Sequence, residues 1–419
     1  MKRLIAFVLA VLMLALTLCS CDEETVLDTL DGIFGESEKE PKSHNEALEI
    51  TQNIDFEPSV TGEVRMPSSL ADFALELFDE CADDDNTVIS PYSVIYALAL
   101  AQKGAAGNTL AEFEELFGVK KDTLEEFLSI SLIAGGDKLK LSNSIWIENS
   151  YKEHVKEDYI TSSKRDFAAE VFLSAFDNTT LREINDYISE KTEGLIKNAL
   201  DRIDKDTVMF LINTVYFKAN WDAPYYKSTE GDFTNIDGKK SRAFYMNSLE
   251  SKFINDDKAT GFIKDYAGGK YAFAAILPNE NIELDDYVDS LTGKKLIDML
   301  STPSEISVSA KLPKFETKYK AELNEALIDM GLNEAFIDGV ADFSNMVSSE
   351  EPIYIDRVIH NAAIKVDEMG TEAAASTIID MNKYSGMIKE YVNLNRPFLY
   401  VIFDTETYLP VFMGQVTNM

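Results

Sequence analysis

Residues 366–377, Val-Asp-Glu-Met-Gly-Thr-Glu-Ala-Ala-Ala-Ser-Thr, decide how the rest of this chain is interpreted. They follow an apolar run at 359–366, and a second such run begins about thirty residues later, at 398–403, so that both runs predict strands. Read with the two-residue period of a strand, the segment places small side chains on one face at Thr371, Ala373, Ala375 and Thr377, and Glu372, Ala374 and Ser376 on the other. Small side chains would let the segment enter between two strands of a sheet. Alanine favours helix over strand, so a flexible or locally helical run is the alternative interpretation.

The segment resembles the reactive-loop hinge of the serpins, in which Glu-Glu-Gly-Thr-Glu-Ala-Ala-Ala-Ala-Thr occurs in many members. Six further motifs of that family follow one another in the family's order between Ser68 and Met419. They are Asn86-Thr-Val-Ile-Ser90-Pro91-Tyr-Ser93, Leu100-Ala-Gln-Lys-Gly104-Ala105-Ala-Gly107-Asn-Thr109, Leu211-Ile-Asn213-Thr-Val-Tyr216-Phe217-Lys218-Ala-Asn-Trp221, Leu312-Pro313-Lys314-Phe315, Asn395-Arg396-Pro397-Phe398 and Phe412-Met413-Gly414. Each motif alone is weak, but six in order make the resemblance to the serpins strong.

The resemblance implies an α+β serpin fold at 68–419, with large mixed, mostly antiparallel β-sheets, about eight or nine helices and an exposed reactive loop at about 367–393. Hydrophobic periodicity predicts helices at 69–78, 91–102, 109–117, 123–132 and 180–200. It predicts further strands at 138–148, 208–218, 270–277, 305–312 and 411–416, with 208–218 of the buried kind. Helices followed by many strands, without regular βαβ alternation, also favour the α+β class.

Residues 1–20 predict a lipoprotein signal peptide. Lys2 and Arg3 precede a continuous apolar run at 4–18, which is short for a membrane-spanning helix. The run ends in Leu18-Cys19-Ser20-Cys21, which resembles a bacterial lipobox, so that Cys21 would become the lipidated first residue of the mature protein. An ordinary secretory signal cleaved nearby is the alternative.

The chain is strongly acidic, since 39 Lys and Arg stand against 73 Asp and Glu, a formal net charge of −34. Such a charge argues against nucleic acids and glycosaminoglycans as partners. Heparin-binding serpins carry Lys and Arg on one early helix, whereas the matching region at 122–131 is acidic here, and we expect no heparin binding. Residues 21–67 are polar and acidic and predict a flexible tether. We therefore expect an exported protein that faces outside on a lipid anchor, or an extracellular protein if it is released.

The sequence lacks the usual enzyme and cofactor motifs. His44, His154 and His360 have no metal-ligand spacing, and neither a Gly-x-Ser-x-Gly elbow nor a phosphate-binding glycine loop is present. If Cys21 carries lipid, Cys81 alone keeps a thiol in the mature protein, and no intramolecular disulfide can form. We expect no enzyme activity, no metal and no cofactor.

The resemblance implies a monomeric, suicide-type inhibitor of serine or cysteine proteases. The protease attacks the loop and forms an acyl-enzyme, and the severed loop then inserts into the main sheet as a new strand and drags the protease with it. About 15 inserted residues at about 3.3 Å each would span about 50 Å, enough to carry the protease to the far end of the domain. Two other classes remain open: a non-inhibitory serpin-fold surface binding protein, and a lipoprotein that binds a small solute. A change in heat stability after loop cleavage separates the protease inhibitor from both of these classes.

Family roles transfer to matching positions. The hinge matches Glu368, Gly370, Thr371, Glu372, Ala373, Ala374, Ala375, Ser376 and Thr377. The shutter, a polar cluster beneath the opening strands, matches Ser90, Ser93, Asn213 and His360. The breach, where the loop first enters the sheet, matches Trp221 and Lys314, and Lys314 is expected to pair with Glu368. A partly exposed pair of that kind contributes only about 0–1 kcal/mol, so that its role would be to position the entrance.

The family's usual spacing from Gly370 places the scissile bond at Tyr384–Ser385. A tyrosine before the cut favours chymotrypsin-like, cathepsin-like or subtilisin-like targets with a roomy apolar pocket. A cut one residue earlier, at Lys383–Tyr384, would instead attract trypsin-like enzymes, and both positions remain open.

Membrane anchoring gives a first testable prediction. The wild-type protein should fractionate with membranes and carry lipid by mass spectrometry, and Cys21→Ala should release or misprocess it, because the acylated sulfur is lost. Recovery of unlipidated wild-type protein wholly in the soluble fraction would contradict the anchor.

Overall fold

The structure, a computed structural model, describes residues 47–56, 68–134, 138–225, 227–348, 352–371 and 388–419. The predicted positions Cys21, 372–377, Tyr384 and Ser385 therefore lie outside the described residues. Among the helices that are described, none is long and apolar enough to cross a membrane.

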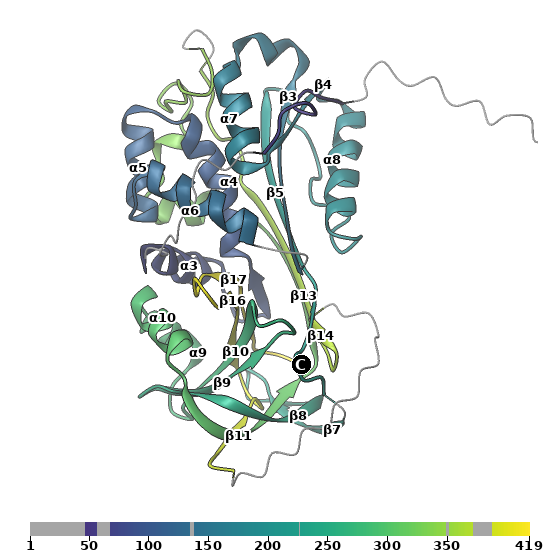
Figure 1. The fold of residues 1–419 in the computed structure, drawn as a ribbon, viewed down its shortest axis with the longest axis vertical. Helices are drawn as coiled ribbons and strands as arrows, with labels where there is room; N and C mark the ends of the chain where they lie inside the picture. The colour runs from purple at the N-terminus through teal and green to yellow at the C-terminus, as the bar shows by residue number, and fades with distance from the viewer. Residues whose placement is uncertain (1–46, 57–67, 135–137, 226, 349–351, 372–387) are drawn as a thin grey trace, which may run out of the picture. The chain divides into compact units, whose positions relative to one another are not determined.

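Two four-stranded sheets meet at one end. The first has the order β1 (Leu48–Glu49), β4 (Glu170–Ser174), β3 (Leu139–Glu148) and β5 (Met209–Phe217), and the second has the order β12 (Phe315–Glu322), β13 (Ile359–Val366), β14 (Gly370–Thr371) and β6 (Ala219–Asn220). Because β6 follows directly on β5, the chain passes from the first sheet to the second at this end. From that junction β5 and β13 run side by side (Figure 1), yet within the described residues neither pairs with the other. We call the space between β5 and β13 the strand gap.

A nine-stranded sheet forms the other half of the domain. Its order is β15 (Glu390–Asn393), β11 (Ser304–Pro313), β8 (Lys240–Asn255), β9 (Ala259–Asp265), β10 (Tyr271–Pro278), β16 (Phe398–Asp404), β17 (Pro410–Val416) and β2 (Thr87–Ile89), and β7 (Ser228–Thr234) pairs with β8. Every residue of β10 and β17 is buried. Most pairings in the three sheets are antiparallel, with parallel pairs at β3–β4 and β11–β15. The predicted α+β class with mixed, mostly antiparallel sheets is confirmed.

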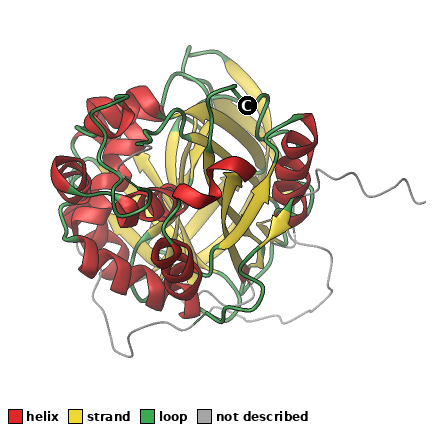
Figure 2. Ribbon diagram, turned by 90° about the horizontal axis from the view of Figure 1, so that it is seen from above, coloured by secondary structure: helices red, strands yellow, loops and turns green. Residues whose placement is uncertain are grey.

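Helices lie on both sides of the strands (Figure 2). They are α3 (Ser68–Cys81), α4 (Pro91–Gly104), α5 (Gly107–Phe117), α6 (Lys121–Ala134), α7 (Glu157–Phe167), α8 (Asn178–Lys191), α9 (Leu284–Asp289), α10 (Gly293–Ser301) and α11 (Asn324–Asp329), with short 3-10 turns η2 (Asn149–His154) and η3 (Glu334–Phe336). The helices predicted at 69–78, 91–102, 109–117 and 123–132 fall within α3 to α6.

Helix α4 connects the sheets, since it packs against both β5 and β17. It begins because Ser90 caps it, with the side-chain oxygen accepting from the Ser93 N–H at 3.2 Å, and because Pro91 suits the first turn. Its residues are buried almost all round, as expected for a helix between two sheets. The cap thereby fixes the helix that forms the floor of the strand gap.

The long helix predicted at 180–200 is too long. Helix α8 ends at Lys191, because Glu193 and Gly194 adopt left-handed backbone with φ of 50° and 83°. The fully buried strand predicted at 208–218 is also wrong in its first half, where residues of β5 are only partly buried. One edge of β5 faces the strand gap, and no strand covers it in the described part of the chain.

Part of the segment expected to form the flexible tether is packed against the domain. Leu48 and Glu49 pair with Leu173 and Phe172 of β4. Thr51 is fully buried, and its hydroxyl oxygen accepts from the Val171 N–H at 3.1 Å. A two-residue strand carries too little periodicity to be recognised, and it is ordered by the free edge of β4.

Candidate functional site

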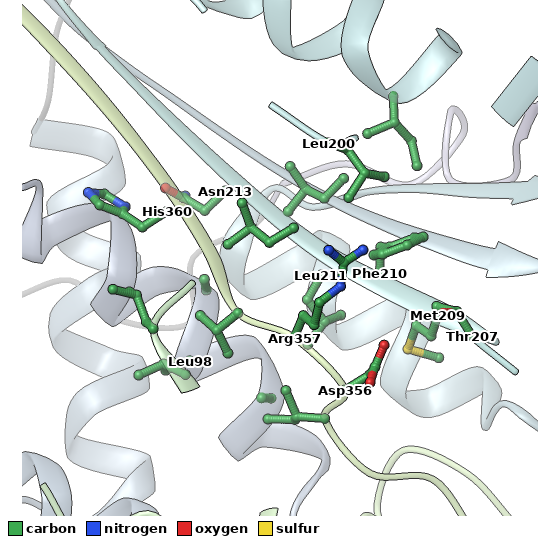
Figure 3. A pocket seen from close by; sticks show the side chains of 18 of the residues that line it. Leu98, Leu200, Thr207, Met209, Phe210, Leu211, Asn213, Asp356, Arg357 and His360 are labelled. Atoms are coloured by element: carbon green, nitrogen blue, oxygen red, sulfur yellow. The ribbon is translucent and has the colours of Figure 1, made fainter. Parts of the chain in front are cut away.

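The strand gap encloses a cavity of about 400 Å³ (Figure 3). Side chains of α4, including Leu98, line one side, and Ile184 and Ile188 of α8 line the other. Residues 209–214 of β5 and 358–361 around the start of β13 form its walls. The cavity therefore follows two strand edges and is lined mainly by apolar side chains.

The four predicted shutter residues are joined by hydrogen bonds, and Ser93, Asn213 and His360 line this cavity. Ser90 Oγ donates to the Val411 carbonyl at 2.7 Å, and Ser93 Oγ donates to Asn213 Oδ1. The Ser90 N–H donates to His360 Nε2 at 3.1 Å. These contacts connect α4 to β5 on one wall of the strand gap and to β13 on the other.

Sequence reasoning missed one member of this cluster. Asn213 Nδ2 donates to Asn143 Oδ1 at 2.6 Å, and Asn143 Nδ2 donates to the Phe167 carbonyl at 2.7 Å. Asn143 is 3% exposed on β3, next to β5. An asparagine in the middle of a predicted strand was the signal available in the sequence, because asparagine is disfavoured in strands and a buried one must find a partner.

His360 is uncharged in this environment. Its Nε2 accepts from a backbone N–H, which can only donate, so this nitrogen carries no proton. Burial lowers the pKa of His360 from its usual 6.5 to about 4. Protonation would replace the acceptor by a donor and place an unpaired charge in the core.

Trp221 lies at the entrance of the gap, where the chain leaves β13 towards β14. Its indole Nε1 donates to the Asp367 carbonyl at 2.9 Å, and its backbone N–H donates to the Met369 carbonyl at 2.9 Å. The ring stacks on Tyr266 with centroids 4.5 Å apart and is 1% exposed. The segment that leaves β13 is thus held by both the backbone and the side chain of one residue.

Lys314 and Glu368 form the ion pair expected at the breach. Lys314 Nζ lies 2.9 Å from Glu368 Oε1, and the side chains are 35% and 30% exposed. Partial burial raises the pKa of Glu368, but the hydrogen bond from Lys314 and other nearby donors outweigh it and lower the pKa overall. With this exposure the pair contributes only about 0–1 kcal/mol, so it orients the entrance more than it stabilises the fold.

The hinge already enters the sheet at Gly370 and Thr371. Gly370 lies opposite Asn220, and Thr371 lies opposite Ala219. A Cβ at Gly370 would collide with the Ala219 carbonyl oxygen, which explains the glycine. Thr371 is 2% exposed, and its Oγ1 lies 2.6 Å from the Tyr266 hydroxyl. The sequence analysis missed Tyr266, because its partner is 105 residues away.

The site offers strand edges rather than reactive groups. Among the described residues, no group of three His, Cys, Asp or Glu could hold a metal ion. Burial raises the pKa of the Cys81 thiol to about 11, which makes it a poor nucleophile. What the arrangement can do is accept an extended segment by backbone hydrogen bonding between β5 and β13.

The buried histidine gives a pH prediction. Because the folded-state pKa of His360 lies below the unfolded value, its contribution to stability is complete above pH 6.5 and is lost as the pH falls towards 4. Between pH 7 and 5 the loss should be about 2 kcal/mol in denaturant unfolding, and His360→Gln should remove it. The control His154→Gln should keep the wild-type pH profile. Equal profiles for wild type and His360→Gln would contradict the assignment.

Residues 68–419 match the family model described as Serpin (serine protease inhibitor). Alpha-1-antiproteinase 2 of Equus caballus is 30% identical over 377 residues, which cover 85% of this chain and 87% of the relative. Alpha-1-antitrypsin of Sus scrofa is 31% identical over 376 residues, which cover 84% and 87%. The crystal structure of the thermophilic serpin tengpin in its native state superposes with a TM-score of 0.82 at 35% identity, over 89% of this chain and 100% of that chain. This chain belongs to the serpin family.

Proposed function

We propose that the protein is a single-turnover inhibitor of serine or cysteine proteases, whose cleaved reactive loop enters the strand gap between β5 and β13. The observation that carries the proposal is the pairing of Gly370 and Thr371 at the top of two strand edges that are otherwise unpaired in the described structure. Relatives that bear the name of antiproteinase, at about 30% identity, support the same class. The loop itself lies outside the described residues.

The register at the entrance explains the small residues of the hinge. Thr371 lies opposite Val366, and both are buried. Residues opposite each other in an antiparallel pair share a face, so a strand continued from Thr371 would place Ala373, Ala375 and Thr377 on the buried side. Larger side chains there would collide with the floor that α4 forms, whereas alanine and threonine fit.

Backbone hydrogen bonding would supply the driving force for insertion of the loop. A strand inserted in the gap would pair with β5 and β13 at once and bury side chains in the cavity of about 400 Å³. The uncleaved loop is tied at both ends, at Thr371 and again where β15 begins at Glu390, which opposes full insertion. Cleavage removes that restraint and releases the new strand.

Anchoring and specificity complete the proposal. A lipid on Cys21 would hold the inhibitor at the cell surface, facing outside. Tyr384 before the cut would direct it to chymotrypsin-like, cathepsin-like or subtilisin-like proteases. A non-inhibitory binding protein of the same fold is the competing function, and the hinge experiment below separates the two.

Thr371→Arg tests the mechanism. Thr371 is already buried between β13 and β6, and burial of an unpartnered arginine there would cost several kcal/mol. The arginine would therefore leave the sheet, and insertion would lose its starting point. The variant should be cut at the same bond as wild type but form little covalent complex on denaturing gels and show no large rise in melting temperature after cleavage. Thr371→Ser, which keeps the hydroxyl group near Tyr266, is the matched control and should inhibit like wild type.

Two outcomes would reject the proposal in different ways. Inhibition by Thr371→Arg as strong as that of wild type would show that strand insertion is not the mechanism. Cleavage of the wild type without a covalent band and without a rise in melting temperature would favour the non-inhibitory binding protein.

Tyr384→Arg tests the scissile bond. Because the residue before the cut fills the protease's primary pocket, the change should shift inhibition from chymotrypsin-like to trypsin-like enzymes. N-terminal sequencing of the released fragment should begin at Ser385 for wild type. A fragment that begins at Tyr384 would place the cut after Lys383 instead.

A further inference from the structure

Arg357 lies just before β13, at the end of the strand gap away from Gly370 and Thr371, and its side chain is almost entirely buried. Its side chain is 8% exposed, and Figure 3 shows it among Leu200, Phe210 and Leu211. A guanidinium group in such apolar surroundings requires compensating partners, because desolvation of a charge is costly.

The present partners of Arg357 satisfy it incompletely. Nη2 donates to the Arg202 carbonyl at 3.0 Å, Nη1 lies 3.4 Å from Asp201 Oδ1, and Nε lies 3.7 Å from Asp204 Oδ2. Nε has no hydrogen-bond partner among the described residues. Asp201 and Asp204 are themselves 60% and 44% exposed, so that both remain well solvated. The guanidinium is thus held by one backbone carbonyl and by two carboxylates, at 3.4 and 3.7 Å, that remain largely in solvent.

The entrance register fixes which loop residue would arrive at Arg357. Val366 pairs with Thr371 in an antiparallel ladder, and Thr371 also pairs with Ala219. In such a ladder each step forward along the loop matches one step back along both neighbours. Nine residues beyond Thr371 is Asp380, and nine residues before Val366 is Arg357. The same count before Ala219 gives Phe210.

The direction of the side chains also fits a contact between Asp380 and Arg357. Opposite residues share a face, so Asp380 would point to the same side as Arg357. Successive side chains of β13 alternate, and Ile359, two residues on, packs in the cluster that contains Ile184 and Ile188 of α8. Asp201 and Asp204 come from the segment that follows α8. The carboxylate of Asp380 would therefore reach Arg357 on the side where those carboxylates now hold it.

The neighbouring loop residues also match the walls of the gap. Ile378 would lie between Ile212 and Ile359, which already pack against the α8 cluster. Ile379 would lie between Leu211 and Val358, both of which line the cavity on its other side. A slip by one residue would reverse every face and bring an isoleucine or Met381 to the charge.

We propose that Arg357 and the walls around it form a recognition site for the Asp380 carboxylate, and that Arg357 exchanges Asp201 and Asp204 for Asp380 when the loop inserts. This rests on the proposed function and adds to it a residue that sets the register and depth of insertion. The exchange places a charge-assisted hydrogen bond at a largely buried guanidinium and ends the contacts of Arg357 with the two carboxylates that follow α8. Both candidate scissile bonds leave Asp380 on the inserting arm.

A double-mutant cycle in the cleaved protein tests the site. Wild type, Asp380→Asn, Arg357→Gln and the double variant are cut with a protease, and guanidinium unfolding is measured before and after cleavage. Asp380→Asn should leave the uncleaved midpoint unchanged and lower the cleaved midpoint by about 0.3 M. The two changes should couple by about tenfold in the unfolding equilibrium constant of the cleaved form. Glu390→Gln removes the same charge at an exposed position of β15, outside the inserting arm, and should have little effect.

The outcomes distinguish this inference from the function on which it rests. If cleavage does not raise the wild-type midpoint, the proposed function fails. If it does, and the effects of Asp380→Asn and Arg357→Gln simply add, Asp380 does not reach Arg357 and the inference alone is overturned. Should Arg357→Gln not fold, Asp380→Arg serves instead. It should lower the cleaved midpoint more than Asp380→Asn, and a cleaved Asp380→Arg protein as stable as wild type would overturn the inference.

Discussion

In the described part of the chain the facing edges of β5 and β13 are unpaired, and the rest of this structure depends on that constraint. Backbone N–H and C=O groups inside a protein require partners, and two neighbouring strands that do not pair leave a row of them without the usual ladder. Gly370 and Thr371 close the gap at its entrance. Farther along, His360 of β13 and Asn213 of β5 are connected through Ser90 and Ser93 at the start of α4. A segment able to complete the ladder would lower the free energy of the whole sheet.

Buried polar groups keep this open arrangement specific. The chain of contacts from Ser93 through Asn213 to Asn143 joins α4, β5 and β3, so that these elements keep one relative position although no described strand pairs with β5 at the gap. Because low polarity strengthens each hydrogen bond and penalises each unpaired group, such a network tolerates few alternatives. His360 adds a proton-sensitive member, since its burial lowers its pKa to about 4 and only the neutral ring can accept from Ser90.

Charge has two different uses along the gap. The Lys314–Glu368 pair at the entrance is about one-third exposed and orients the chain with little net gain in stability. Arg357 at the other end is nearly buried, and its partners are mostly solvated. A surface pair can be exchanged with water at little cost, whereas a buried cation favours whichever state brings it a close carboxylate. Under the proposed mechanism, the end of the gap at Arg357 is therefore where charge would distinguish the inserted loop from the uninserted loop.

The sequence by itself determined the family, the fold class and the bounds of strongly periodic elements. Strand β13 was predicted residue for residue, and the helices α3 to α6 were found because apolar spacing is a local signal. The shutter residues followed from motif resemblance, not from any pattern that showed their contacts.

Only the tertiary structure decided the rest, because the partners concerned are far apart in the chain. Asn143 meets Asn213 across 70 residues, Thr371 meets Tyr266 across 105, and Arg357 meets Asp201 across 156. The two-residue strand β1 exists because β4 presents a free edge, and the first half of β5 is only partly buried because no described strand fills the gap beside it. Periodicity reports which face of an element is apolar, but it does not report which distant element covers that face or leaves it open.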